Sequence, residues 1–233
     1  MTAPLSPPRL LPSGDAAVTV EFGRVIDEQA NRRVLALDRA VADAAIDGVT
    51  ETVPTYRSLL VHYDPVWIGF DELGERLMAL VRLPAPPTTK TRRWRIPVAY
   101  GDEHGVDLET IAKTLNTTPD DIVARHLAGD YRVAIIGFTP GWSYLSGLDD
   151  SLQLPRRESP RLLTPSGAIS IGGLQTGIQC LAGPSGWHLI GRTAMRTYQL
   201  HRDPVFLLEP GDAVTFHAVD GKQFAEQDRA AAR

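Results

Sequence analysis

The stretch VAIIGFTPGWSYLSG, residues 133–147, runs from an apolar segment directly into a loop of glycines and aromatic rings. Residues 133–136 have the β-branched composition of a buried strand, and the glycine that follows marks its end. A loop that only turns the chain has no need for Phe138, Trp142 and Tyr144. We therefore expect these rings either to cover the end of a sheet or to wall a pocket that a flat ligand enters.

The chain around this stretch favours many short strands. Strands are expected at 94–98 and 131–138, with helices at 107–115 and 119–127 between them. From 137 to 219 the chain is rich in glycine and proline, with apolar runs at 168–171, 187–190, 205–208 and 213–218. Short strands separated by turn residues are typical of a β-barrel or a β-sandwich.

The first half of the chain predicts a different architecture. Its pattern indicates a strand, a helix, two paired strands and a second helix, at 16–22, 27–46, 49–54, 58–63 and 71–83. Asp27 is the expected N-cap of the first helix. This order suggests a small sheet with helices on one face. The segment LPAPPTTKTRR that follows reads as a linker, which divides the chain into domains at 1–88 and 89–233.

Composition excludes several classes of protein. The formal net charge is −4 and the isoelectric point is near 5.9, which argues against a general nucleic-acid binder. No apolar stretch is long enough to span a bilayer, and no signal peptide is evident, so we expect a cytoplasmic protein without membrane contact. Cys180 is the single cysteine, so no internal disulfide is possible. Its alternating surroundings favour a small core residue over a nucleophile.

Familiar catalytic motifs are missing. The six histidines have no zinc-ligand spacing, so no metal site is expected, and no serine sits in a G-x-S-x-G elbow. The stretch GGLQTG, residues 172–177, lacks the Gly-Lys-Ser/Thr ending of a phosphate loop. Two interpretations of it stay open: a tight bulged hairpin, or a turn whose amides and polar side chains approach a ligand.

Arginines on stiffened turns are the stronger chemical signal. Arg156, Arg157 and Arg161 lie in PRRESPR, where prolines restrict the backbone. Arg192 follows the expected strand at 187–190 in the same manner. A guanidinium held on a rigid turn is preorganised to bind an anion. The alternative is a solvated face or a salt bridge to Glu158, Asp149 or Asp150, and we prefer it for Arg157, which is the neighbour of Glu158.

Five motifs in order give a family resemblance. GFTPGWSYLSGL, the PR repeats of PRRESPRLLTPSG, ISIGGLQTGI, PSGWHLIGRT and LEPGDAVTF together resemble the family of the 5-oxoprolinase B subunit. The same family is called allophanate hydrolase subunit 1, carboxyltransferase subdomain C/D, and the sporulation kinase A inhibitor family. The resemblance also includes LPSGDAAVTVEFG near the N-terminus, so it covers nearly the whole chain.

The resemblance implies a fold and an activity. The fold is an α+β N-terminal domain followed by a mainly β, cyclophilin-like barrel. The activity is that of one subunit, inactive alone, of an ATP-dependent 5-oxoprolinase that hydrolyses the lactam of 5-oxo-L-proline to L-glutamate. Its partners would be a larger, cyclophilin-like C subunit and an A subunit. One alternative is half of a biotin-dependent urea carboxyltransferase or allophanate hydrolase complex. Another is a non-catalytic inhibitor of a sporulation-type histidine kinase.

The residues that match the family motifs supply the candidate site. The expected catalytic side chains are Arg156, Arg161, Gln175 and Arg192. The expected substrate-binding residues are Phe138, Pro140, Gly141, Trp142, Tyr144, Gly173, Thr176 and Thr193. We expect the three guanidinium groups and the carboxamide to converge beside the rings, because a carboxylate binds guanidinium and a lactam amide needs a paired donor and acceptor.

Overall fold

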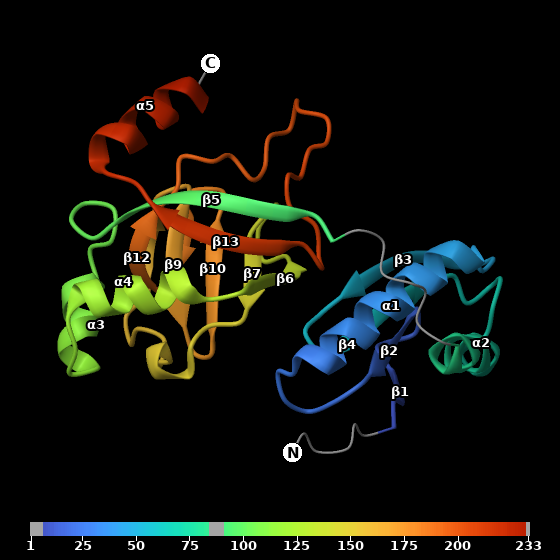
Figure 1. Cartoon of the computed structure of the whole chain (residues 1–233). Helices are drawn as coiled ribbons and strands as arrows, with labels where there is room; N and C mark the ends of the chain where they lie inside the picture. The colour runs from blue at the N-terminus through green and yellow to red at the C-terminus, as the bar shows by residue number, and fades with distance from the viewer. Residues whose placement is uncertain (1–6, 84–90, 232–233) are drawn as a thin grey trace. The chain divides into compact units, whose positions relative to one another are not determined.

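The computed structural model describes residues 7–83 and 91–231, and the chain divides into two compact units, Met1–Lys90 and Thr91–Arg233 (Figure 1). The predicted boundary between residues 88 and 89 lies outside the described residues. Each unit has its own hydrophobic core. The α+β unit followed by a mainly β barrel confirms the predicted fold class.

The N-terminal unit is built on an antiparallel sheet. Its strands stand in the order β1 (Arg9–Pro12), β2 (Ala17–Glu21), β4 (Ser58–Tyr63) and β3 (Val49–Pro54). Strand β1 was not predicted. Val18 lies opposite Val61 and Val20 opposite Leu59, so one face of the sheet carries the apolar side chains.

Two helices cover that apolar face. Helix α1 (Glu28–Ala44) begins where the Asp27 side chain accepts a hydrogen bond from the Ala30 amide, as predicted. Helix α2 (Phe70–Arg82) contributes Leu73 and Leu77 to the same core. The predicted sheet with helices on one face is therefore confirmed for this unit.

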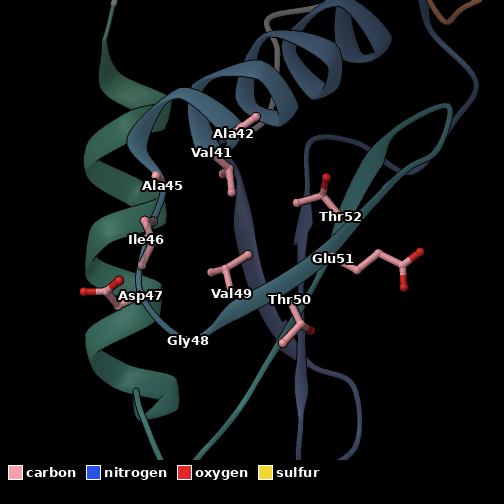
Figure 2. A pocket seen from close by; sticks show the side chains of 10 residues that line it. All are labelled: Val41, Ala42, Ala45, Ile46, Asp47, Gly48, Val49, Thr50, Glu51 and Thr52. Carbon is pink, nitrogen blue, oxygen red and sulfur yellow. The ribbon is translucent and has the colours of Figure 1, made fainter.

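A surface depression of about 420 Å³ lies where α1 ends and β3 begins. Its lining consists mostly of small and apolar residues between positions 41 and 52. The carboxylates of Asp47 and Glu51 extend in opposite directions (Figure 2). Polar groups do not converge there, so the depression has none of the features of a catalytic site.

The C-terminal unit is a closed barrel. The strands around it are β10, β7, β6, β13, β5, β12 and β9, and β9 pairs with β10 to close the circle. Their bounds are β5 Arg93–Tyr100, β6 Tyr131–Ile136, β7 Ser143–Ser146, β9 Ala168–Gly172, β10 Gln175–Gln179, β12 His188–Arg192 and β13 Ala213–Ala218. Strand β13 runs parallel to β5, whereas the other barrel pairings are antiparallel.

Helices and a small ribbon surround the barrel. Between β5 and β6 lie α3 (Leu108–Thr114) and α4 (Pro119–Ala128), close to the predicted bounds. A 3₁₀ turn (Asp150–Leu152) follows β7, and β8 (Arg161–Thr164) pairs with β11 (Gly183–Ser185) outside the barrel. Helix α5 (Gly221–Ala231) packs on β5 through Phe224.

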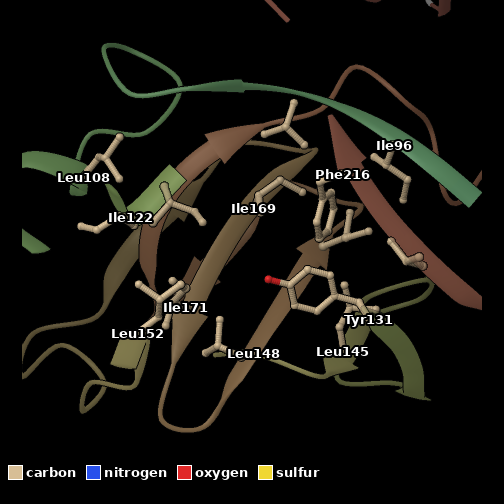
Figure 3. Packing of buried hydrophobic residues seen from close by; sticks show 14 of the residues in the cluster. Ile96, Leu108, Ile122, Tyr131, Leu145, Leu148, Leu152, Ile169, Ile171 and Phe216 are labelled. Carbon is tan, nitrogen blue, oxygen red and sulfur yellow. The ribbon is translucent and has the colours of Figure 1, made fainter. Parts of the chain in front are cut away.

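Side chains fill the inside of the barrel. Tyr131, Phe216, Ile169 and Leu145 point toward one another, and residues of α3 and α4 such as Ile122 close the cluster (Figure 3). Side chains fill the interior of small β-barrels in this way. The interior of the barrel is therefore a packed core and not a ligand cavity.

One predicted strand is wrong. Residues 205–208 form only an isolated bridge between Phe206 and Tyr198. The guanidinium of Arg202 donates to the carbonyls of Arg196, Thr197 and Val205. The Gln199 amide donates to the Val205 carbonyl and the Leu207 amide to the Thr197 carbonyl, so the segment pairs briefly with residues 197–199 and stays outside the barrel sheet.

Candidate functional site

The GGLQTG stretch forms a tight hairpin between β9 and β10, as one of the two interpretations predicted. Gln175 lies opposite Gly172, and Gly173 takes a φ of +65° in the connecting loop. Such a positive φ favours glycine. Successive side chains of β10 alternate between the inside and the outside of the barrel. The hairpin therefore presents two chemically separate surfaces.

A chain of hydrogen bonds occupies the inner side. The Tyr100 hydroxyl lies 2.8 Å from His126 Nδ1, and His126 Nε2 lies 3.1 Å from Thr176 Oγ1. Thr176 in turn donates to the Ser170 carbonyl at 3.0 Å. Burial lowers the pKa of His126 to about 3, so the ring is neutral at physiological pH. Thr176, expected to bind substrate, lies inside the barrel and away from the aromatic rings.

The outer side carries a layer of aromatic rings. Trp187 lies over two glycines: a Cβ at Gly172 would approach Trp187 Cδ2 to 2.6 Å, and a Cβ at Gly177 would approach Cζ3 to 3.3 Å. Trp142 and Tyr144 stand against Trp187 with ring centroids 5.8 and 5.7 Å away. We call Phe138, Trp142, Tyr144 and Trp187 the aromatic cluster. Sequence reasoning left Trp187 out of the candidate residues, although it is adjacent to a glycine-rich turn.

The loop before β7 holds one ring of this cluster in solvent. Phe138 packs edge-to-face on Trp142 with centroids 5.6 Å apart, yet it is 70% exposed and has a φ of +68°. A bulky residue in the left-handed region is a rare and strained conformation. At Gly141, also at positive φ, a Cβ would lie 2.6 Å from Tyr198 Cβ. The loop is therefore fixed by close packing and keeps Phe138 outward.

Cys180 supports this loop and has no sign of reactivity. Its thiol is buried and donates to the carbonyl of Pro140. Burial raises the pKa of the Cys180 thiol, which disfavours the thiolate. The prediction of a small core residue is confirmed.

Arg156 lies at the aromatic cluster, and Gln175 belongs to the strand beneath it. The guanidinium carbon of Arg156 lies 5.6 Å from the ring centroid of Trp187, within cation–π range. Burial raises the pKa of the Tyr144 hydroxyl, and the charge of Arg156 opposes that effect. Gln175 is register partner of Gly172, beneath Trp187, and is 9% exposed. Among the residues that the structure describes, its carboxamide has no hydrogen-bond partner.

Further polar atoms on the outer side also have no partner. Trp142 Nε1, Ser170 Oγ and Gln179 Oε1 are buried, and within the described residues none makes a hydrogen bond. Trp142 Nε1 lies 3.3 Å from the position of a Cβ on Gly177, which is the register partner of Ser170. Buried polar groups are normally paired. The outer side of the hairpin therefore offers donors and acceptors that the protein itself does not use.

Arg161 is engaged elsewhere. Its two terminal nitrogens donate to Asp107 at 2.8 and 2.6 Å, and Arg157 donates to the same carboxylate at 3.1 Å. Arg157 therefore forms a salt bridge, which was one of the expected alternatives, but with Asp107 instead of Glu158, Asp149 or Asp150. Asp107 was not recognised from sequence, because its partners lie far along the chain.

Arg192 and Thr193 lie at the opposite end of the hairpin. Arg192 Nε donates to the Ser166 carbonyl at 2.8 Å, and its guanidinium lies 5.2 Å from the Phe224 ring on α5. Its register partner Ala168 is four residues from Gly172 along β9, a span of about 13 Å. Arg161 and Arg192 therefore have partners of their own, whereas Arg156 stands over Trp187 and Gln175 pairs with Gly172 beneath that ring, so the structure does not bring all four catalytic candidates together.

The described residues contain neither a group suited to a metal ion nor a helix suited to a membrane. In residues 7–83 and 91–231, no group of three or more His, Cys, Asp or Glu side chains is arranged to hold a metal ion. No helix in those residues is long and apolar enough to cross a membrane.

The fold and the site define a class of protein, and comparison with known families agrees. The family model for the carboxyltransferase domain, subdomain C and D, matches residues 8–208, and the chain belongs to this family. Within it, similar curated proteins are the 5-oxoprolinase B subunits of Bacillus subtilis, 33% identical, and of Escherichia coli O157:H7, 35% identical. These matches cover 91% and 87% of this chain and 92% of each relative. The resemblance predicted from the sequence motifs is confirmed.

Solved structures show the same fold. TTHA0988 is 37% identical with a TM-score of 0.79, over 88% of this chain but only 40% of that longer chain. PH0987 from Pyrococcus horikoshii is 38% identical with a TM-score of 0.56, over 93% of this chain and all of that one. The Kluyveromyces lactis urea amidolyase, 22% identical with a TM-score of 0.77 over 94% of this chain and 15% of its own, shares the fold alone.

Proposed function

We propose that this chain is the B subunit of an ATP-dependent 5-oxoprolinase, an amide hydrolase complex that opens the lactam of 5-oxo-L-proline to give L-glutamate. The observation that carries the proposal is the similarity to 5-oxoprolinase B subunits over nearly the full length of both proteins. The outer side of the β9–β10 hairpin provides the substrate site.

The chemistry of the aromatic cluster suits this substrate. A five-membered lactam is flat, and its face matches the partly exposed ring of Tyr144, which packs on the buried Trp187. The exposed guanidinium of Arg156 is the partner for the substrate carboxylate. Gln175 has a carbonyl and an NH₂ group that no other described residue uses, and a lactam amide needs one acceptor and one donor.

Other groups support the substrate without reacting with it. Trp142 Nε1 and Ser170 Oγ lie on the same side of the hairpin and add hydrogen-bonding capacity. Phe138, Pro140 and Gly141 form the loop at the rim, and Gly173 leaves open space at the hairpin end. None of these groups is an acid or base that titrates near neutral pH. The nucleophile and its activation therefore come from other subunits.

The glycine-rich stretch of this chain is poorly suited to bind ATP. The glycine-rich stretch is a β-hairpin without a following helix, so it lacks the N-terminal amides that bind phosphate in nucleotide loops. We assign ATP binding to the assembled complex, through a partner of the A-subunit type, and expect the barrel to work beside a larger C subunit. The chain alone is expected to be inactive.

The test is reconstitution with purified partner subunits. The complete mixture should release glutamate from 5-oxoproline only when ATP is present, and omission of this chain should abolish the activity. Arg156→Ala should lower kcat/KM about 100-fold, mainly through KM, because it removes the carboxylate partner. Arg95→Ala, an exposed arginine on β5, is the matched control and should retain activity.

Three results would count against the proposal, the first against its substrate site and the other two against the activity itself. Unchanged kinetics in the Arg156 variant would remove the site, although not the assignment to the complex. Biotin-dependent carboxylation of urea in place of lactam hydrolysis would favour the carboxyltransferase alternative. This measurement is worthwhile because a putative urea carboxylase of Emericella nidulans is 23% identical over 92% of this chain. Inhibition of a histidine kinase with no hydrolysis would favour a regulatory protein.

A further inference from the structure

Asp107 is a buried carboxylate that four donors satisfy. Its side chain is 6% exposed. Arg161 binds both oxygens, Arg157 binds Oδ1, and the backbone amide of Leu189 donates to Oδ2 at 2.7 Å. Burial alone would raise the pKa of Asp107, but hydrogen bonds from Arg161 and Leu189 and the charges of both arginines bring it below its usual value. The carboxylate is therefore ionised and fully committed to these partners.

The loop that carries Asp107 is itself fixed to the barrel. The Asp107 amide donates to the Leu189 carbonyl at 3.1 Å, and the Gly101 amide donates to the Ile190 carbonyl at 3.1 Å. A Cβ at Gly105 would lie 2.1 Å from that Ile190 oxygen, a distance that only glycine permits. The carboxylate is thus held on β12, the strand that directly follows Trp187.

Two side chains of the segment from Pro155 to Arg161 bind this carboxylate. Arg157 and Arg161 both reach Asp107, and the Arg157 amide donates to the Gly186 carbonyl at 2.8 Å. Arg156, the neighbour of Arg157, lies instead over Trp187. The same backbone therefore places one guanidinium in the clamp and its neighbour at the aromatic cluster.

We propose that Asp107 is a positioning residue, which clamps the Pro155–Arg161 segment so that the Arg156 guanidinium stays over Trp187 and meets the substrate carboxylate. This inference rests on the proposed function for its catalytic consequence, whereas the clamp itself does not depend on which substrate binds. A guanidinium held in place loses little entropy on binding, so releasing it weakens substrate binding even though Arg156 remains.

Asp212 provides a matched control within the same unit. Its side chain is also 6% exposed, and it accepts from Arg92 at 2.9 and 2.6 Å, from Trp94 Nε1 at 2.9 Å and from the Glu209 amide at 2.9 Å. This cluster ties β5 to the loop before β13. Asp107→Asn and Asp212→Asn therefore remove the same charge from similar surroundings, but only the first should affect the Arg156 segment.

The first experiment measures amide hydrogen exchange in the full chain without partners. Asp107→Asn should speed exchange at Arg157, whose amide bonds to Gly186, at least tenfold relative to wild type. Asp212→Asn should leave that amide unchanged. Equal protection of Arg157 in wild type and Asp107→Asn would overturn the clamp. If Asp107→Asn does not fold, Arg161→Lys serves, since lysine keeps the charge but loses the two-pronged contact.

The second experiment is a double-mutant cycle in the reconstituted complex. Asp107→Asn should raise KM for 5-oxoproline about tenfold with kcat nearly unchanged, and Asp212→Asn should leave KM unchanged. In an Arg156→Ala background, Asp107→Asn should change KM less than about twofold, because it acts through Arg156. A full tenfold effect in that background would overturn the positioning role. No effect of Arg156→Ala itself would instead remove the proposed substrate site.

Discussion

The two sides of the β9–β10 hairpin differ in how completely their polar groups are used. On the inside, Tyr100, His126 and Thr176 form a continuous series of hydrogen bonds that ends on the Ser170 carbonyl. On the outside, the Ser170 hydroxyl and the Gln179 carbonyl oxygen are buried without partners among the described residues. Under the proposed function, the same two strands serve stability through one side and substrate recognition through the other.

The strongest test of this division exchanges neighbours on β10. Gln175→Ala should lower kcat/KM of the reconstituted complex about 100-fold, because it removes a hydrogen-bonding group aimed at substrate. The free energy of unfolding of the Gln175→Ala chain should change by less than about 0.5 kcal/mol, since no hydrogen bond within the protein is lost. Thr176→Val should do the reverse, costing about 1–3 kcal/mol of stability with normal kinetics.

Steady-state kinetics and urea denaturation of both variants check this pair. Thr176→Val is the control for Gln175→Ala, because both positions lie on one strand and are buried. Loss of activity in the folded Thr176 variant, or marked destabilisation by Gln175→Ala, would break the division between the two sides.

A smaller effect is expected from the pH dependence of stability. The pKa of His126 in the folded chain is about 3, below the usual 6.5, so the unfolded state binds a proton first as the pH falls. The contribution of the neutral His126 to the free energy of unfolding is complete above pH 6.5 and is lost as the pH falls toward 3. Between about pH 7 and 5 wild type should lose about 2 kcal/mol more than His126→Gln, which has no proton to bind.

Denaturation curves of the two proteins at several pH values measure this difference. The carboxylates titrate in both, so subtraction isolates the histidine. Parallel pH profiles of the two proteins would mean that His126 takes up its proton as readily in the folded chain as in the unfolded chain. The inner network would then need another arrangement.

The smallest effect concerns the strained loop on the outer side. Phe138→Gly and Phe138→Ala both remove the ring, but only glycine tolerates a φ of +68° without cost. The glycine variant should be more stable than the alanine variant by about 1 kcal/mol. Chemical denaturation of both variants measures the difference, and an alanine variant of equal or higher stability would show that the loop carries no strain.

Much of the fold follows from local pattern. Strands β3, β4 and β13 match the predicted bounds to the residue, because their alternation and flanking turns are unambiguous. Helix α5 was missed, since Phe224 is its one buried anchor among the described residues. A signal was present: Asp220 and Gln223 bond each other's backbone amides, which is a capping box readable from the sequence.

The candidate site was predictable only in part. The aromatic rings and Gln175 lie on neighbouring strands, because β7 pairs with β10; the family motifs named these residues, but the sequence did not predict the pairing. Arg161 was expected there, but its partner Asp107 lies 54 residues earlier in the chain, and a pairing over that separation has no periodic signal. Polar atoms without partners among the described residues, such as Trp142 Nε1, are visible only when the packing is known.

The parallel pair of β5 and β13 has a consequence for biosynthesis. Arg93 is the register partner of Ala213, and the other neighbour of β5 is β12, so both of its partners are translated much later. In a nascent chain leaving the ribosome, one edge of β5 therefore stays unpaired until β13 emerges, and an exposed strand edge can pair with other chains. A chaperone that covers the unpaired edge of β5 would therefore matter most when synthesis of the residues between β5 and β13 is slow.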